Sequence, residues 1–196
     1  MDTVKAIEIF ALVTGIPYII LEVMQKNSMW YFGIASGIGC AVSFAIQGLW
    51  ASMGLNIYYV FMSLWGLYQW KKYSDSLAME SASSSAVHLS RLTPGIIAWS
   101  AAVFLAGLAG LIALLSFLND TETVWDAVVA MMSIVGTYWL AKAYLPHWII
   151  WIVSDLLLIV LCAMTGMFWM SLLYLAYTIS SVVGLVHWRR NGVYVA

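Results

Sequence analysis

One ionisable residue, Asp155, lies deep inside an apolar stretch of the chain, and two tryptophans precede it. Trp148, Trp151 and Asp155 stand at positions i, i+3 and i+7, which places them on one stripe of a helix. If this stretch crosses a bilayer, a carboxylate at its centre costs about 2.5–3.5 kcal/mol, so such a residue is by default a functional candidate. Two indole faces beside one anion suit an organic cation, because each cation–π contact contributes roughly 0.5–2 kcal/mol. The alternatives are an Asp155 that bonds a neighbouring helix and a Trp148 at the membrane interface.

Polar side chains in two further apolar stretches complete a candidate pocket. They are Asn56, Tyr58, Tyr59 and Gln69 in the third stretch, and Tyr174, Tyr177 and Thr178 in the seventh. Polar groups inside lipid need partners, and either a ligand or a neighbouring helix can supply them. The predicted ligand contacts are Trp148, Trp151, Asp155, Asn56, Tyr59, Tyr177 and Tyr174.

Other polar residues are assigned structural roles. Ser133, Thr137 and Ser154 are expected to serve close helix packing. Glu22 and Lys26 are four residues apart at a predicted helix end, so we expect them to form a surface pair.

The composition excludes several classes of protein. Of the 196 residues, 64% are hydrophobic and only 9% are charged, whereas soluble domains are roughly 45–50% apolar and about 25% charged. A cytosolic enzyme, a nucleic-acid-binding protein and a disordered protein are therefore excluded, and the net charge of −1 offers nothing to DNA. We expect the lipid bilayer to be the principal partner of this surface.

The sequence shows no catalytic or metal-binding constellation. Cys40 and Cys162 are the two cysteines, and both lie in apolar stretches, which argues against a disulfide framework or a metal site. A phosphate-binding loop, a zinc-protease motif and a Ser-His-Asp spacing are absent. The N-terminus lacks a basic leader, so we expect no removable signal peptide. We therefore expect passage or binding of a small molecule, with no enzymatic activity and no cofactor.

Apolar runs separated by polar breaks predict an all-α membrane protein with seven transmembrane helices. The predicted spans cover residues 4–24, 28–47, 50–70, 95–118, 124–142, 146–165 and 167–187. The longest break contains the Ser-rich segment SDSLAMESASSSAVHLS, which is typical of a flexible linker.

The placement of basic residues predicts the orientation of these spans. Seven of the eight Lys and Arg residues fall on the side that holds the C-terminus, which the positive-inside rule makes cytoplasmic. They are Lys26, Lys71, Lys72, Arg91, Lys142, Arg189 and Arg190. The opposite side has Lys5 beside the acidic residues Asp2, Glu8, Asp120, Glu122 and Asp126. The N-terminus is therefore expected outside and the C-terminus inside.

An internal repeat appears when the chain is shifted on itself by 118 residues. Without a gap, IQGLWASMGLNIYYVFMSLWGLYQWKK falls on MTGMFWMSLLYLAYTISSVVGLVHWRR. Matched residues include Gly48 with Gly166, Tyr59 with Tyr177, Gly66 with Gly184, Trp70 with Trp188, Trp30 with Trp148, Ser36 with Ser154, and Glu8 with Asp126. The predicted fold is a 3+1+3 arrangement with two parallel three-helix repeats, and transporters of this kind bind substrate between the halves.

The repeat divides the chain into four parts. We expect a first three-helix repeat at 1–72, a flexible cytoplasmic linker at 73–94, a connecting helix at 95–118, and a second three-helix repeat with a short cytoplasmic tail at 119–196.

Three segments resemble the PnuC-type vitamin transporters. HWIIWIVSD, from His147 to Asp155, resembles their N-W-x-x-W-x-x-x-N segment. ASMGLNIYYVFMSLWGLYQW from Ala51 resembles an A-S…Y-G-W-x-x-W stretch, and WDAVVAMMSIV from Trp125 resembles W-D-S…S-I-V. The resemblance implies a SWEET-like fold of seven helices, a homotrimer, and facilitated diffusion of a vitamin that a cytoplasmic kinase then traps. It also implies a bacterial inner membrane location and ligand contacts at Trp148, Trp151 and Asp155.

The departures from this pattern bear on the substrate. The nicotinamide riboside carriers of this family resemble the chain except that they have Asn at the Asp155 position, G-x-I-N near Gly33 to Ser36, and Y-G-W at Trp65 to Leu67. An ionised Asp accepts hydrogen bonds but cannot donate to a carboxamide. It can pair with a thiazolium and accept from an aminopyrimidine. We therefore expect thiamine as the substrate, with nicotinamide riboside as the alternative. Two further alternatives concern the function: a ligand sensor without transport, and proton-coupled transport through Asp155.

Overall fold

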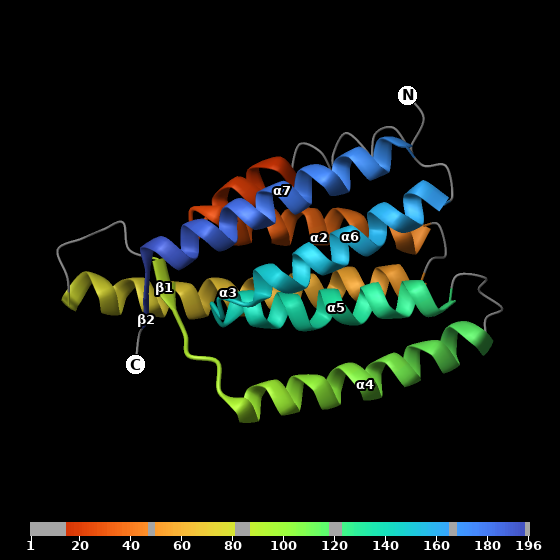
Figure 1. Cartoon of the computed structure of the whole chain (residues 1–196), viewed down its shortest axis with the longest axis horizontal. Coiled ribbons are helices and arrows are strands. Elements are labelled where there is room, and N and C mark those ends of the chain that lie inside the picture. The colour runs from red at the N-terminus through yellow and green to blue at the C-terminus, as the bar shows by residue number, and fades with distance from the viewer. Residues whose placement is uncertain (1–14, 47–49, 81–86, 118–122, 165–167, 195–196) are drawn as a thin grey trace.

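Long apolar stretches fold into helices that run roughly side by side (Figure 1). The computed structural model describes residues 15–46, 50–80, 87–117, 123–164 and 168–194. A helical segment at 15–23 is followed by α2 (Met29–Ile46), α3 (Trp50–Glu80), α4 (Pro94–Phe117), α5 (Thr123–Ala141), α6 (His147–Met164) and α7 (Phe168–Asn191). Two short strands, β1 (Val87–Leu89) and β2 (Gly192–Tyr194), pair in parallel. The predicted positions Lys5, Glu8, Gly48, Asp120, Glu122 and Gly166 lie outside the described residues.

The helices differ in how well each suits a membrane on its own. Among the described residues, Pro94–Leu114 and His147–Met164 are long and apolar enough to cross a bilayer, with mean hydropathies of 2.2 and 2.1. Shorter apolar stretches are found in α2, at Met29–Val42, and in α5, at Ala127–Ala141. The predicted count of seven membrane crossings therefore stays a prediction.

The two halves begin their helices in the same register. Helices α2 and α6 start 118 residues apart, at Met29 and His147, and α3 and α7 start 118 residues apart as well. The turn before each pair has a residue in the left-handed region, Gln25 at φ 48° and Ala143 at φ 54°. Both residues end a helix where a glycine is usual, so the same unusual backbone is built twice.

The hydrogen bonds of these two turns also correspond. The Lys26 N–H donates to the Leu21 carbonyl at 2.8 Å, and the Tyr144 N–H donates to the Trp139 carbonyl at 2.9 Å. The Gln25 N–H donates to the Glu22 carbonyl at 3.0 Å, as the Ala143 N–H donates to the Leu140 carbonyl at 2.8 Å. Each set is a Schellman motif, which satisfies the last carbonyls of the helix before it.

A buried tryptophan packs against a glycine in each half. A methyl group on Gly66 would overlap the Trp30 ring, and one on Gly184 would overlap the Trp148 ring. The second tryptophan of each half completes an edge-to-face pair: Trp30 with Trp70 at 5.0 Å between ring centroids, and Trp148 with Trp188 at 5.4 Å. All four tryptophans are fully buried in one hydrophobic cluster, so the repeat expected from Gly and Trp positions is present in their packing.

The segment expected to be a flexible linker differs from that expectation. Helix α3 continues through Glu80, and β1 follows with its three residues buried. The Gln25 side chain holds the β1 backbone twice, because its Nε2 donates to the His88 carbonyl at 2.9 Å and its Oε1 accepts from the His88 N–H at 2.7 Å. The Ser90 N–H donates to the Ala143 carbonyl at 3.1 Å. The strand thus touches both left-handed turns, and its partners lie far away in the sequence.

Candidate functional site

A cavity of about 360 Å³ lies between the helices of the two halves, within the range typical of small-molecule sites. Its walls come from the 15–23 segment, α2, α3, α5, α6 and α7. The lining residues are Gly15, Tyr18, Ile19, Glu22, Phe32, Gly33, Ser36, Gly37, Asn56, Tyr59, Ser63, Ser133, Thr137, Trp148, Trp151, Ser154, Asp155, Leu158, Tyr174, Tyr177 and Ser181.

All seven predicted ligand contacts line this one cavity. Helix α6 contributes Trp148, Trp151 and Asp155, because its period places all three on the face toward the cavity. Helix α3 contributes Asn56 and Tyr59. Helix α7 contributes Tyr174 and Tyr177, whose rings make an edge-to-face pair at 6.2 Å. The structure therefore brings the predicted residues together, and their contact with a ligand stays a prediction.

Three other polar residues considered from the sequence do not line the cavity. The Tyr58 hydroxyl donates to the Ile134 carbonyl at 2.8 Å, which joins α3 to α5. The Thr178 hydroxyl donates to the Tyr174 carbonyl of its own helix at 2.9 Å. Gln69 is buried outside the cavity wall. Tyr58 therefore makes the helix–helix hydrogen bond that was the alternative to ligand contact.

The charge of the cavity comes from two carboxylates. Glu22 and Asp155 are 5% and 7% exposed, and no Lys or Arg lies among the described lining residues. Trp148 and Trp151 line the cavity, and their buried Nε1 atoms have no hydrogen-bond partner among the residues the structure describes, so both N–H groups are available as donors. Such a site suits a positively charged molecule that has aromatic faces and acceptor atoms.

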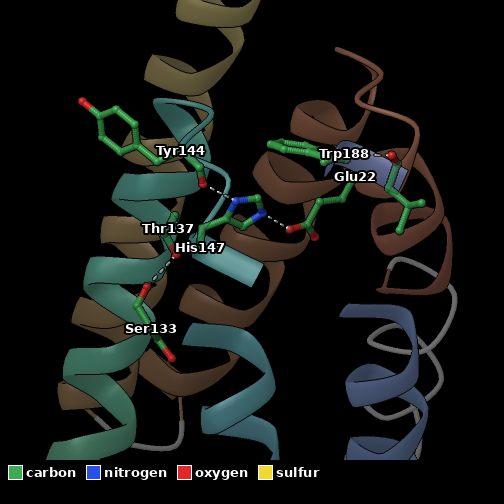
Figure 2. A network of polar contacts seen from close by, with 7 residues as sticks. Glu22, Ser133, Thr137, Tyr144, His147 and Trp188 are labelled. Atoms are coloured by element: carbon green, nitrogen blue, oxygen red, sulfur yellow. Dashed lines mark hydrogen bonds and ion pairs between the residues drawn. The ribbon is translucent and has the colours of Figure 1, made fainter. Parts of the chain in front are cut away.

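The interpretation of Glu22 as a surface residue paired with Lys26 is wrong. Glu22 is buried, and its Oε1 lies 3.5 Å from Nε2 of His147, which is fully buried (Figure 2). The i,i+4 spacing failed because the helix ends in the left-handed turn at Gln25, so Lys26 no longer continues the helical register. Lys26 is exposed.

A signal for this pair was present in the repeat. At the offset of 118 residues, Leu140 matches Glu22 and Met29 matches His147. An acid and a histidine at positions that are apolar in the other half mark a departure from the repeated scaffold. The register alone could therefore have identified both residues.

The three residues expected to serve packing border the cavity. Thr137 donates its hydroxyl to the Ser133 carbonyl at 2.7 Å, a bond within α5 that agrees with a packing role. Ser133, Thr137 and Ser154 nevertheless all lie in the lining. Sequence reasoning also missed Gly33 and Gly37, which lie on the α2 side of the cavity. Among the described residues, no group of three or more His, Cys, Asp or Glu could hold a metal ion.

Comparison with known proteins gives matches over nearly the full chain. The profile of a family described as nicotinamide mononucleotide transporter matches residues 5–190. The nicotinamide riboside transporter PnuC of Escherichia coli (strain K12) is 23% identical over 204 residues, covering 94% of this chain and 85% of that protein. A protein of the same name from Neisseria mucosa is 28% identical over 192 residues, covering 92% and 70%. A crystal structure of the vitamin B3 transporter PnuC superposes with a TM-score of 0.71 at 24% identity, covering 96% of this chain and 83% of that one.

Proposed function

Because the chain belongs to the nicotinamide mononucleotide transporter family, we propose that it carries a small cationic vitamin across a membrane by facilitated diffusion. The observation that carries the proposal is the charge of the cavity. Glu22 and Asp155 line it, and no Lys or Arg does so among the described residues. A fixed organic cation gains Coulomb attraction from these carboxylates and cation–π attraction from Trp151.

The same charge argues against a phosphorylated substrate. A phosphate group is recognised by Arg, Lys or clustered backbone N–H groups, and the described cavity wall has two carboxylates in place of basic side chains. Nicotinamide riboside, which has the pyridinium cation without the phosphate, fits this charge. The relatives found are named for nicotinamide riboside, which makes it the first candidate substrate.

Thiamine is the second candidate, and Asp155 is the residue that favours it. Thiamine also has a fixed positive charge, and its aminopyrimidine donates hydrogen bonds that an ionised carboxylate accepts. The comparisons lend no support to a preference for thiamine over nicotinamide riboside. The choice between the two vitamins therefore belongs to a binding measurement on both.

The outer surface of the molecule supports a location in lipid. Large apolar and aromatic side chains are exposed on it, whereas the polar residues Ser63, Ser133, Ser154 and Ser181 are buried around the cavity. The most exposed of the large side chains include Tyr31, Phe61, Tyr68, Trp99, Leu105 and Phe117. This distribution is the reverse of a soluble protein, which exposes polar groups and buries apolar ones.

The rest of the proposed transport scheme follows from the sequence. We propose seven crossings in a 3+1+3 arrangement in a bacterial inner membrane, with the N-terminus outside and the C-terminus in the cytoplasm. The excess of basic residues on one side supports this orientation. A homotrimer, and trapping of the vitamin by a cytoplasmic kinase, are proposed by resemblance to the PnuC-type transporters.

Uptake into liposomes that contain only this protein tests the proposal. Labelled nicotinamide riboside or thiamine should enter faster than into empty liposomes and should reach equal concentrations on both sides when no membrane potential is present. Asp155→Asn, reconstituted at the same density, is the matched variant and should slow the entry. Binding without entry would favour the alternative of a ligand sensor, and neither binding nor entry would contradict the proposal.

A further inference from the structure

The Glu22–His147 contact has a geometry that fixes one proton position. Nδ1 of His147 lies 2.8 Å from the carbonyl oxygen of Tyr144, and Figure 2 shows the ring held between that carbonyl and Glu22. A carbonyl oxygen can only accept, so Nδ1 must carry a hydrogen and donate it. The other ring nitrogen, Nε2, then faces the carboxylate of Glu22 at 3.5 Å.

A second proton is needed between the two side chains. In the neutral ring with hydrogen on Nδ1, Nε2 is an acceptor, and so is each oxygen of an ionised carboxylate. Two buried acceptors facing each other, with no hydrogen-bond partner for either atom among the described residues, are unfavourable. One proton on His147 or on Glu22 turns the contact into a donor–acceptor pair with no net charge.

The surroundings hold this pair rigidly. The His147 ring packs against both Trp148 and Trp188, with centroid distances of 4.5 Å and 4.8 Å. Nε1 of Trp188 donates to the Val23 carbonyl at 3.0 Å, which ties α7 to the helix end that presents Glu22.

The fold itself does not require an acid and a base here. At the offset of 118 residues, Glu22 matches Leu140 and His147 matches Met29, and both Leu140 and Met29 are fully buried in the hydrophobic cluster. The scaffold thus accommodates two apolar side chains in the matching place. The acid–base pair occurs once, on the side where Glu22 also borders the cavity.

We propose that Glu22 and His147 form a proton-binding site in the cavity wall, and that a cationic vitamin entering the cavity displaces this proton to solvent. The inference rests on the proposed function. With the proton bound, the pair is neutral and an ionised Asp155 gives the cavity one net negative charge. When the proton leaves, the cavity has two negative charges, which attract the cation more strongly but repel each other when it is absent.

Other titratable groups surround the pair, and one of them must be separated from it. The Glu22 charge acts on Tyr18 and on Asp155. The groups on the adjoining elements are Tyr18 on the 15–23 segment, Tyr59 on α3, Lys142 after α5, Asp155 on α6, Tyr174 and Tyr177 on α7, and His88 on β1, with exposed Lys26 in the turn. Tyrosine and lysine keep their protons at neutral pH, and burial lowers the pKa of His88 to about 4, so Asp155 is the group that the test must distinguish.

Calorimetric titration in buffers of different ionisation enthalpy measures protons released per ligand bound. The titrants are nicotinamide riboside and thiamine, and the protein is the full chain in detergent. Wild-type protein should release a measurable fraction of one proton per ligand, up to a full proton. Its affinity should rise with pH, by at most about tenfold per pH unit, over the pH values at which protons are released. Glu22→Gln should abolish the release, because the amide donates to Nε2 without an added proton. Asp155→Asn should bind more weakly but still release the proton.

Several results would overturn the inference. Binding by the wild type without proton release at any pH would do so, and so would release that persists in Glu22→Gln or vanishes in Asp155→Asn alone. If neither vitamin binds, the proposed function is contradicted, and nitrogen NMR of His147 in the ligand-free protein decides the proton site. The proton site is supported if the Nε2 chemical shift of His147 changes with pH and Glu22→Gln alters that change. It is refuted if the chemical shift responds neither to pH nor to the substitution.

Discussion

At the offset of 118 residues, Gly33 and Gly37 on α2 stand where Trp151 and Asp155 stand on α6. All four line the cavity, so one wall supplies space and the other supplies an indole and a carboxylate. The glycines also let α2 approach α3 closely, since a methyl group on Gly33 would lie 2.7 Å from Oγ of Ser63. The two halves thus differ sharply at these two positions of the cavity wall.

The tryptophans behave in the opposite way. Trp30 and Trp148 both pack on a glycine and both pair with a second tryptophan, although only Trp148 lines the cavity. Recurrence by itself does not separate scaffold from site, because the matched pairs Tyr59/Tyr177, Ser36/Ser154 and Ser63/Ser181 all line the cavity. Its packing on Gly184 and Trp188 makes Trp148 first a packing residue, and we propose that Trp151, Asp155 and Glu22 carry the recognition.

The largest expected effect comes from replacing Glu22 and His147 by the residue types that match them at the offset of 118 residues. His147→Met alone leaves Glu22 buried without its partner and should lower the free energy of unfolding by about 3–5 kcal/mol. Adding Glu22→Leu gives the pair of residue types found at Met29 and Leu140, and the double variant should regain or exceed wild-type stability. Thermal unfolding in detergent measures both. A double variant as unstable as the single one would show that the halves are not equivalent here.

The next largest effect concerns Asp155. Asp155→Asn should weaken binding of a cationic vitamin by about 2–5 kcal/mol, because a buried charge loses its partner, which is roughly 30- to several-thousand-fold. Trp151→Phe keeps an aromatic face and should cost on the order of 1 kcal/mol. Calorimetry on the two variants checks the order. If the affinity of Asp155→Asn is within about threefold of wild type, Asp155 does not recognise the charge of the ligand and serves helix packing.

The scaffold can be tested at its matched glycines. Gly66→Ala and Gly184→Ala each force a methyl group into a tryptophan ring, so both should be destabilising by about 1–3 kcal/mol. Gly54→Ala is the control, since a methyl group there has no atom within 4 Å and should be neutral or slightly stabilising. Unequal losses in the two matched variants would break the equivalence of the halves.

The sequence predicts the repeated parts of this molecule better than the parts that occur once. Glycine and tryptophan positions gave the register of the halves because close packing allows few other residues there. The helical period grouped Trp148, Trp151 and Asp155 because residues three, four and seven positions apart lie on one face of a helix. Glu22 was misassigned because the chain leaves the helix at Gln25, a turn without the usual glycine.

The strand β1 was missed for a different reason. Its partners are the Gln25 side chain, 63 positions away along the chain, and β2 near the C-terminus. A Ser-rich composition predicts local flexibility, whereas docking of this strand depends on contacts between distant segments. The surface that β1 contacts forms only when these distant segments of the chain have come together.

The most local of the expected effects lies in β1 itself. Burial lowers the pKa of His88 from its ordinary 6.5 to about 4, so the folded strand resists protonation. Its docking is therefore fully stable above pH 6.5 and weakens as the pH falls toward 4. Hydrogen exchange of the His88 and Leu89 amides, corrected for intrinsic rates, should show this loss while the helices stay protected. His88→Phe should remove the pH dependence, and protection constant over that interval in the wild type would contradict it.

Charge recognition is tested most directly by pairs of ligands that differ in one charge. Nicotinamide riboside and its reduced dihydro form have nearly the same shape, as do thiamine and its neutral deaza analogue, but only the first of each pair is a cation. Calorimetry should show that the cation recognised by this cavity binds at least about tenfold more tightly than its neutral counterpart, a difference of about 1.4 kcal/mol. The preference should become smaller in Asp155→Asn, in which Glu22 is the remaining carboxylate among the described lining residues. Equal binding of a cation and its neutral counterpart by the wild type would contradict recognition by Asp155 and Glu22.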